Sequence, residues 1–559
     1  MLTLLCVAVA LVLIGRLYYL QIMHGNAYLT RADAQFTQPA SPLLNRGIIY
    51  LTDNTNSQIA AAIIKDGFSI AVNPTKVTDA NKLCAAVEGV ATISDTDCIA
   101  KATKQGTQYQ MLAQHLSSDA GTTLESKALA GLIIEEDRWR EYPGGSLAAQ
   151  EIGFVAYNNS DTQQGVYGLE KKYNNTLERK DDDLYTNFFV ELFGGVKSLI
   201  SGAPQEGDLV TTIDPNVQSE LEQELAAYQS TWHPQMAGGI IMNPQNGEIY
   251  AMAVSPTFDL NSFNTETDPL IYANQMVQNV YEMGSIVKPL TMAAGLDSGA
   301  VTENETYNDT GCIMVDKKKI CNFDLKARGV IPMQQVLSQS LNVGASFVAT
   351  QMGSSTMRDY FFNHYGMATS TGIDLPGEQK GIFNNMQSPR SVEYDTASFG
   401  QGIAMTPVEM VRALAVLANG GYMVTPHFVR SIRYTTGITQ NLNWPKIGPE
   451  LKPETSTTID RMLTNVVDQA FAKGMSFPHY SVAAKTGTAQ IANPAGGGYY
   501  TDRYLHSYMG FFPSYNAKYI IFLFGYEPVG APYSSETWGS TFHSLVQFLI
   551  NYYNVPPDR

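Results

Sequence analysis

Positive charge is scarce in this chain. Its 559 residues include 36 lysines and arginines against 52 aspartates and glutamates, which gives a formal net charge of −16. The lysines and arginines also do not gather into a basic cluster. Proteins that bind nucleic acid present a basic surface to the phosphates. The charge balance therefore argues against nucleic acid as a partner.

Metal-binding side chains are also few. The chain has 8 histidines, and they are scattered, so none of them has the spacing to cysteines that a zinc site requires. The acidic run at residues 181–183 fits a solvated loop better than a metal site. We expect neither a metal nor a cofactor.

The chain has only 5 cysteines. Cys6 lies in the apolar start of the chain, while Cys84 and Cys98 form one nearby pair and Cys312 and Cys321 another. The second pair flanks a polar turn between two short apolar runs, which predicts a disulfide across a hairpin. Two local pairs are typical of an oxidising exterior. The alternative is four buried thiols without a disulfide.

Long apolar runs are rare, and the one that stands out opens the chain. Residues 1–22 carry a single charge, at Arg16, with Tyr18 and Tyr19 close behind it. A signal peptide needs a basic lead-in and a nearby small-residue cleavage site, but no basic residue precedes the run and Ala-x-Ala comes only at 32–34. About 20 apolar residues cross a bilayer. We interpret residues 1–22 as an uncleaved membrane anchor, with the two tyrosines at the interface.

Residues 23–205 show no catalytic pattern, and the composition changes near 205. From there, strands at both ends with helices between them predict a domain with an antiparallel sheet. Asn246-Gly247 indicates a hairpin, and Thr406-Pro407 with Glu409 forms a capping box at a helix start. The expected strands are 207–213, 238–242, 249–253, 480–490, 505–512 and 518–525. One helix is expected to begin at Pro215, and three more are expected over about 332–351, 455–472 and 535–552.

One stretch places a hydroxyl and an amine one helical turn apart. Ser285 and Lys288 are followed at once by Pro289, which fits a helix only in its first turn, so we expect a helix to begin at or near Ser285. Both side chains then share a face close to unpaired N–H groups. Acyl transfer needs these parts: a nucleophile, a base whose pKa burial lowers, and oxyanion donors. Alone, the pattern favours a plainer interpretation, a capping serine beside a solvated lysine.

Two further motifs follow in order. Ser-Leu-Asn stands at 340–342, within a helical pattern that we expect to break there, and Lys-Thr-Gly-Thr stands at 485–488. Separately they fit capping residues and an edge strand. Together, Ser-x-x-Lys, a variant of Ser-Asp-Asn and Lys-Thr-Gly are the motif set of penicillin-binding proteins and related β-lactamases.

The sequence closely resembles the class B penicillin-binding proteins, which are peptidoglycan D,D-transpeptidases, over nearly its whole length. The resemblance implies the α+β penicillin-binding transpeptidase fold, a five-stranded antiparallel sheet between helices, with an elongated N-terminal pedestal and one transmembrane helix. We divide the chain into an anchor at 1–22, a non-catalytic, dimerisation-like pedestal at 23–205 and a transpeptidase domain at 206–559. Further stretches that carry the likeness are Arg46-Gly47, Arg140 with Tyr142-Pro143, Gly168-Leu169-Glu170, residues 214–218, residues 374–378 and residues 399–402. The departure is at 51–55, where the family usually has Asp-Arg-x-Gly, and it concerns the pedestal.

The resemblance also implies roles for the motif residues. Ser285 would attack the penultimate D-Ala carbonyl of a stem peptide that ends in D-Ala-D-Ala, and Lys288 would accept its proton. Ser340 would relay a proton to the leaving D-Ala, Asn342 would hydrogen-bond the substrate amide, and Lys485 would supply positive charge. Two lysines in one cleft lower each other's pKa, as a base at neutral pH requires.

The last motif would hold the substrate. Thr486 and Thr488 would bind its terminal carboxylate, and Gly487 would let its backbone lie against the strand edge. The N–H groups of Ser285 and Thr488 would form an oxyanion hole. A β-lactam would acylate the same serine and stay there, because its ring-opened product has no leaving group that departs.

Three other functions fit the sequence less well. A β-lactam hydrolase needs a base for the deacylating water and has no use for a pedestal, and a β-lactam sensor normally has several membrane spans. A non-catalytic cell-wall scaffold has no reason to keep Ser285, Lys288 and Lys485. Residues 399–404 and the lack of large insertions favour a septal over an elongation-type enzyme.

No glycosyltransferase signature is recognisable in the pedestal. We therefore expect a separate polytopic glycan polymerase and division proteins as partners, besides stem peptides, β-lactams and the membrane. The expected location is the cytoplasmic membrane, crossed once, with the catalytic domain outside the cytoplasm.

Overall fold

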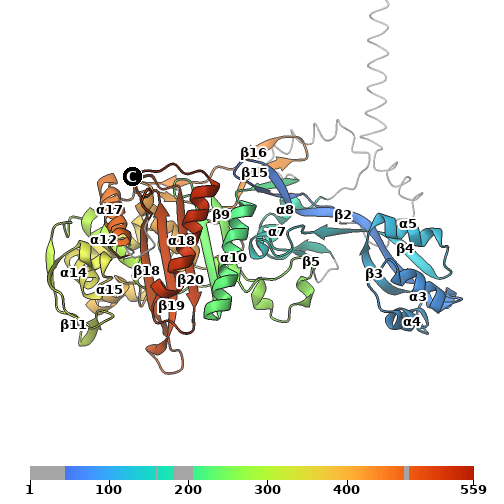
Figure 1. Ribbon diagram of the computed structural model, residues 1–559, viewed down its shortest axis with the longest axis horizontal. Coiled ribbons are helices and arrows are strands. Elements are labelled where there is room, and N and C mark those ends of the chain that lie inside the picture. Colours follow the sequence, from blue (N-terminus) through green and yellow to red (C-terminus); the bar gives the residue numbers. More distant parts are fainter. Residues whose placement is uncertain (1–43, 159–161, 180–205, 471–476) are drawn as a thin grey trace, which may run out of the picture. The chain divides into compact units, whose positions relative to one another are not determined.

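The computed structural model describes residues 44–158, 162–179, 206–470 and 477–559 (Figure 1). These residues form two compact units. Of the described residues, 44–45 and Ile64–Arg140 belong to unit 1, while Arg46–Ile63 and those from Glu141 to Arg559 belong to unit 2. Within the described ranges, none of the helices is both long enough and apolar enough to cross a membrane. The predicted anchor and the acidic run at 181–183 lie outside the described residues, and the division of the chain at 22 and 205 stays a prediction.

Among its described residues, unit 1 packs three helices against a small sheet. The second half of β2 (Gln58–Val72) pairs with β3 (Gln110–Leu116), and β4 (Leu132–Glu141) also pairs with β2. The helices are α3 (Ala80–Glu88), α4 (Asp95–Ala102) and α5 (Ser118–Ser126). Cys84 of α3 and Cys98 of α4 form a disulfide inside the core of this unit.

Unit 2 contains two main sheets, and the first is mixed. Its strand order is β16 (Thr439–Asn441), β15 (Val429–Tyr434), β7 (Gly207–Thr211), β1 (Ile49–Thr52) and the first half of β2, with β7 parallel to β1. The strand predicted at 207–213 therefore exists as β7, but it belongs to this sheet. Short elements beside it are α6 (Ala149–Ile152), α7 (Gly168–Lys172), α8 (Asn174–Leu177), β5 (Val155–Tyr157) and β6 (Gln163–Gly165).

The second sheet confirms the predicted five antiparallel strands. Its order is β18 (Ala483–Ala492), β19 (Tyr499–Phe512), β20 (Tyr519–Tyr526), β8 (Met236–Met242) and β9 (Ile249–Ser255). Successive side chains of a strand point to opposite faces, so Ile240 and Ile241 enter two different cores. The hairpin between β8 and β9 turns at Gly247, whose φ of 86° favours glycine.

Two long helices, α10 (Pro215–Trp232) and α18 (Ser534–Tyr552), cover one face of the five-stranded sheet (Figure 1). Their apolar faces meet Ile241 and Phe512, and Tyr228 of α10 stacks on Trp538 of α18 with ring centroids 3.5 Å apart. Asp214 caps α10 by accepting the N–H groups of Asn216 and Val217. This confirms the helix start predicted from Asp214 and Pro215.

The remaining helices form the core on the other face and carry the catalytic motifs. Among them α16 (Pro407–Ala418) is buried along its whole length, as an apolar helix at the centre of a domain should be. The others are α11 (Gln275–Gln278), α12 (Lys288–Asp297), α13 (Gln334–Ser338), α14 (Asn342–Asp359), α15 (Ser391–Ala397) and α17 (Pro453–Ala470). Short strand pairs here are β10 (Thr306–Asp309) with β13 (Gly329–Pro332), β11 (Cys312–Val315) with β12 (Lys318–Cys321), and β14 (Met423–Val424) with β17 (Lys446–Ile447).

Thr406 and Glu409 make the contacts of the predicted capping box at α16. Thr406 accepts the N–H of Glu409 at 3.2 Å, which is the expected cap. The Glu409 carboxylate interacts in return with the backbone N–H of Thr406, and it also accepts the N–H of Ala368 at 2.5 Å. The helix start was thus predictable, and the long-range contact of its glutamate was not.

Candidate active site

Ser285 lies in a 3-10 turn that leads directly into α12. The turn spans Gly284–Val287, the helix begins at Lys288, and Pro289 is its second residue. The expected helix start is therefore correct to within a turn. Gly284 has a φ of 64° and its N–H binds the carbonyl of Gly400 at 3.1 Å, which fixes the entry into the turn.

Lys288 points back at the serine. Its Nζ lies 2.9 Å from Ser285 Oγ, 2.6 Å from the Ser340 carbonyl oxygen and 3.2 Å from Ser340 Oγ. The side chain is 1% exposed. Burial, and secondarily the charge of Lys485, lower the pKa of Lys288 well below its usual value. A lysine that is neutral at physiological pH can accept a proton from a hydroxyl.

Ser340 occupies the predicted break between α13 and α14. Its φ of 54° is in the left-handed region, which costs a non-glycine residue conformational energy. This conformation presents both its carbonyl and its hydroxyl to Lys288. The strained backbone therefore lies at the residue whose hydroxyl contacts Lys288.

Lys485 completes a chain of hydrogen bonds. Its Nζ donates to Ser340 Oγ at 2.8 Å and to the carbonyl of Thr486 at 2.9 Å. Burial lowers the pKa of Lys485 to about 7. Within the described residues, neither lysine forms an ion pair with a carboxylate, so no negative charge offsets the cost of burying their charge. Ser285, Lys288, Ser340 and Lys485 are thus connected in that order.

Asn342 is the one member of the first two motifs that the hydrogen-bond chain leaves out. It is the first residue of α14, and its Nδ2 donates to the carbonyl of Cys321 at 2.9 Å. The amide is therefore held by a neighbouring hairpin and not by the lysines. Sequence reasoning had no signal for this contact, because the acceptor is a backbone atom.

The Lys-Thr-Gly-Thr motif lies on β18, an edge strand of the described sheet. A Cβ on Gly487 would lie 2.7 Å from the carbonyl of Met283, so the chain's own packing demands glycine there, whatever the substrate requires. Thr488 Oγ1 accepts the N–H of Ser534 at 3.2 Å. A Cβ on Gly284 would come within 3.1 Å of the Thr488 backbone, so the turn that carries Ser285 packs against this strand.

Sequence reasoning missed a supporting serine. Ser507 pairs with Gly487 across the β18–β19 ladder, and its hydroxyl donates to the Met283 carbonyl at 2.8 Å. This bond ties β19 to the segment just before Ser285. A buried serine inside an apolar strand was the available signal.

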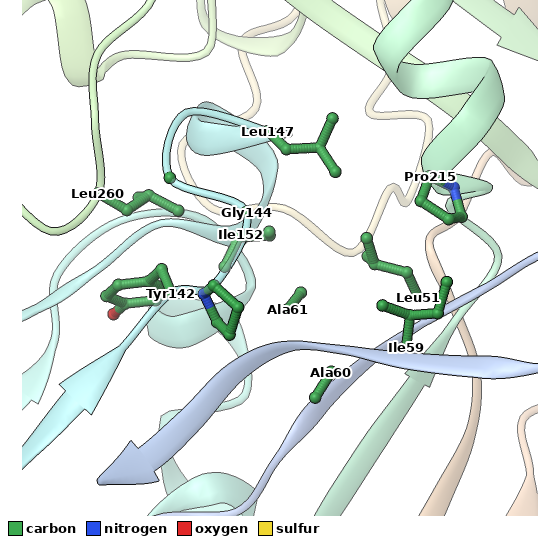
Figure 2. Close-up of a pocket in the computed structure, with 12 residues that line it drawn as sticks. Leu51, Ile59, Ala60, Ala61, Tyr142, Gly144, Leu147, Ile152, Pro215 and Leu260 are labelled. Atoms are coloured by element: carbon green, nitrogen blue, oxygen red, sulfur yellow. The ribbon is translucent and has the colours of Figure 1, made fainter.

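A cavity of about 180 Å³ lies away from the catalytic groups, beside β1 and β2 (Figure 2). Its lining is almost entirely apolar, and no residue of the three motifs takes part in it. The residues are Leu51, Ile59, Ala60, Ala61, Tyr142, Pro143, Gly144, Gly145, Leu147, Ile152, Pro215 and Leu260.

Comparison with known proteins agrees with this arrangement. The penicillin binding protein transpeptidase domain matches residues 237–543, and the penicillin-binding protein dimerisation domain matches residues 45–187. Stage V sporulation protein D of Bacillus subtilis is 28% identical, over 94% of this chain and 80% of its own length. Peptidoglycan D,D-transpeptidase FtsI of Escherichia coli is 25% identical, over 99% of this chain and 91% of its own.

A solved structure shares the fold. Penicillin binding protein 3 from Mycobacterium tuberculosis, complexed with ampicillin, has a TM-score of 0.70 and 22% identity, covering 92% of this chain and 97% of that one. The transpeptidase domain match alone covers more than half of the chain. The connected hydroxyls and amines thus belong to a known fold, and the chain is a member of the penicillin-binding protein transpeptidase family.

Proposed function

We propose that this chain is a serine D,D-transpeptidase that cross-links peptidoglycan stem peptides through an acyl-enzyme on Ser285. The observation that carries the proposal is the distance of 2.9 Å between Lys288 Nζ and Ser285 Oγ, with the lysine almost completely buried. That pairing supplies an activated nucleophile without a histidine.

Acylation begins at the penultimate D-Ala of the donor peptide. Ser285 Oγ attacks its carbonyl carbon while Lys288 Nζ takes the hydroxyl proton. The N–H groups of Ser285 and Thr488 stabilise the oxyanion that forms. The C–N bond then breaks, and the terminal D-Ala leaves with a proton that passes from Lys288 through Ser340 Oγ. An ester on Ser285 remains.

Deacylation reverses the proton path. The amine of a second stem peptide attacks the ester carbonyl, and its proton is taken up by Lys288. The C–O bond to Ser285 breaks and the proton returns to the serine oxygen. The products are a new peptide bond between two stem peptides and the free enzyme.

The other motif residues bind the donor. Thr486 and Thr488 hold the terminal carboxylate beside Lys485, which carries positive charge below its pKa of about 7. Asn342 hydrogen-bonds the donor's amide. Gly487 keeps the strand edge free of a side chain.

Covalent labelling by a fluorescent penicillin tests the proposal. We expect the full chain to be labelled at Ser285, and Ser285→Ala to remain unlabelled. Label that persists for many minutes supports a transpeptidase, whereas rapid loss of the label would indicate a β-lactam hydrolase. A properly folded wild type that takes up no label would contradict the proposed nucleophile.

We also propose that residues 1–22 anchor the chain in the cytoplasmic membrane, with the transpeptidase domain outside the cytoplasm and a role in septum formation. The apolar sequence of residues 1–22 supports the anchor, and residues 399–404 together with the lack of large insertions favour the septal role. Added protease should cleave the domain in cells whose outer layers have been removed. Septal enrichment of a fluorescent fusion supports the division role, and an even lateral distribution would favour elongation.

A further inference from the structure

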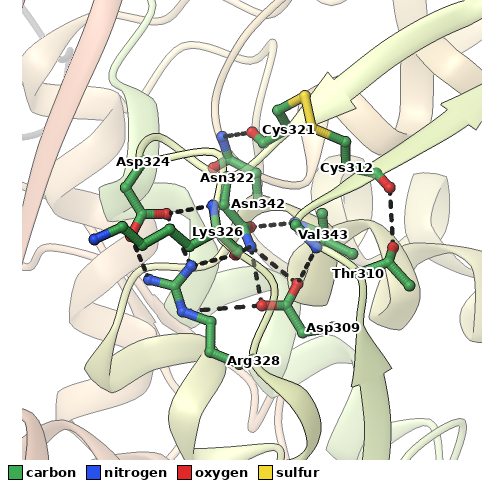
Figure 3. The surroundings of a disulfide bond; sticks show 11 residues. Asp309, Thr310, Cys312, Cys321, Asn322, Asp324, Lys326, Arg328, Asn342 and Val343 are labelled. Carbon is green, nitrogen blue, oxygen red and sulfur yellow. Dashed lines mark hydrogen bonds and ion pairs between the residues drawn. A yellow bond between two sulfur atoms is a disulfide. The ribbon is translucent and has the colours of Figure 1, made fainter.

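The hairpin of β11 and β12 is a small sheet of its own, closed by a disulfide (Figure 3). Its turn contains Asp316 and Lys317, both with positive φ, 48° and 65°, as a tight hairpin turn requires. Cys312 and Cys321 face each other at the opposite end and are bonded there. An isolated two-stranded hairpin is marginally stable in water, so this covalent closure matters for where the strand ends lie.

The end of β12 makes two consecutive contacts with the start of α14. Asn342 Nδ2 donates to the carbonyl of Cys321 at 2.9 Å, and the N–H of Val343 donates to Asn322 Oδ1 at 3.1 Å. A carbonyl oxygen only accepts, so the Cys321 contact determines which end of the Asn342 amide faces the hairpin. Asn322 provides the cap that Leu341, the residue before the helix, has no side-chain oxygen to provide.

Asn322 is itself fixed from the other side. It is 1% exposed, and its Nδ2 donates to both carboxylate oxygens of the buried Asp309 at 2.9 and 3.0 Å. Arg328 Nε lies 3.9 Å from Asp309 Oδ2, and Arg328 Nη2 forms an ion pair with Asp324 Oδ2 at 2.8 Å. One side of the Cys321–Asn322 pair is therefore held by a buried polar network, and the other side by the disulfide.

We propose that the Cys312–Cys321 disulfide positions Asn342 for substrate recognition. The inference rests on the proposed function, in which Asn342 hydrogen-bonds the amide of the donor peptide or of a penicillin side chain. Cys321 and Asn322 are positioning residues: they touch no substrate and act through Asn342. Without the disulfide, the end of β12 moves and the Asn342 amide loses its fixed partner, while Ser285 and both lysines keep their contacts.

The test compares acylation rates of the full chain in detergent. Cys312→Ala with Cys321→Ala is expected to lower the second-order rate constant for a fluorescent penicillin about tenfold, the order of losing one oriented hydrogen bond. The matched control is Cys84→Ala with Cys98→Ala, which removes the other disulfide, in unit 1. That control should keep the wild-type rate.

A double-mutant cycle separates positioning from general stability. If the disulfide acts through Asn342, its removal should matter little once Asn342 is alanine. The acylation rate constant of the triple variant should then be less than about twofold below that of Asn342→Ala alone. Competition by 6-aminopenicillanic acid, which lacks the side-chain amide, should be unaffected by removal of the disulfide. Additive losses, or equal losses with both β-lactams, would overturn the inference in favour of a structural role.

Reduction provides a second route that needs no mutation. Dithiothreitol supplies two electrons and two protons, which convert the disulfide into two thiols, and is itself oxidised to a cyclic disulfide. Reduction should lower the acylation rate constant of wild type by the same factor as the Cys312/Cys321 substitutions do, and reoxidation should restore the original rate constant. If wild type is labelled at Ser285 and the Cys312/Cys321 variant is labelled equally fast, the inference fails and the proposed function stands. If wild type is not labelled, both fail.

Discussion

Lys485 Nζ lies 2.8 Å from Ser340 Oγ, and the same hydroxyl also accepts a hydrogen bond from Lys288. One serine thus separates two buried lysines. Like charges so close disfavour double protonation, and burial disfavours any protonation at all. The charge on Lys485 therefore helps to lower the pKa of Lys288, the proposed base.

Replacing Lys485 by glutamine should shift the pH dependence of acylation. In the proposed mechanism Lys288 acts in its neutral form, so the rate is expected to rise with pH through the pKa of Lys288. Positive charge on Lys485 lowers that pKa, so its removal raises the pKa and moves the rising part of the pH–rate profile to higher pH. Penicillin acylation rates measured from about pH 5 to pH 9 would show the shift.

The control for this experiment is Lys485→Arg. Arginine keeps the charge throughout this pH range, so the rising part of the profile should remain at low pH even if the rate itself falls. If the pH–rate profile of Lys485→Gln rises at the same pH as that of wild type, burial alone sets the pKa of Lys288.

Lys485→Met should stabilise the fold while slowing acylation. Burial lowers the pKa of Lys485 from 10.5 to about 7, so between these values the unfolded chain binds the extra proton. The resulting loss of unfolding free energy in the wild type is absent above pH 10.5 and reaches its full size below about pH 7. We expect the variant to gain roughly 1–3 kcal/mol of unfolding free energy near pH 7 and little near pH 10.5. Denaturant unfolding at both pH values measures this, and an equal gain at both would contradict it.

Features that depend on neighbouring residues were predictable from the sequence. Asp214 with Pro215 begins α10, Asn246-Gly247 turns the β8–β9 hairpin, and the break at Ser340 separates α13 from α14. In each case the signal is a backbone preference within a few positions. The three motifs, found in order along the chain, likewise predicted the residues of the candidate site.

Features that depend on distant packing were not predictable. The Cys321 carbonyl that binds Asn342 has no signature in sequence, since every residue has a carbonyl. Gly487 fitted a role toward substrate, yet the Met283 carbonyl already excludes any side chain there. β7 had the pattern of a strand, but that pattern does not identify its sheet.

Arg46 and Glu170, from two stretches 124 residues apart, form a buried ion pair of 2.5 Å. Glu170→Ala leaves a guanidinium buried without its carboxylate, so we expect a loss of about 3–5 kcal/mol in unfolding free energy. The control is the exposed pair of Arg461 and Glu303, where Glu303→Ala should cost no more than about 1 kcal/mol. Chemical denaturation compares the two. Similar losses would mean that burial of the Arg46–Glu170 pair does not increase its contribution to the unfolding free energy.

Ser340 allows its hydroxyl and its backbone to be tested separately. Ser340→Ala removes the hydroxyl and keeps a side chain at a φ of 54°, whereas Ser340→Gly removes the hydroxyl and also relieves the strain. Both variants interrupt the connection between Lys288 and Lys485, so both should lose acylation to the same extent.

Only their stabilities should differ. We expect the glycine variant to be about 1 kcal/mol more stable than the alanine variant, because alanine pays for the left-handed conformation and glycine does not. Thermal unfolding of the pair measures this difference, and acylation by penicillin measures the hydroxyl. If the glycine variant acylated markedly faster than the alanine variant, the backbone conformation of Ser340 would limit catalysis as well as its hydroxyl, and the strain would then have to be counted as part of the mechanism.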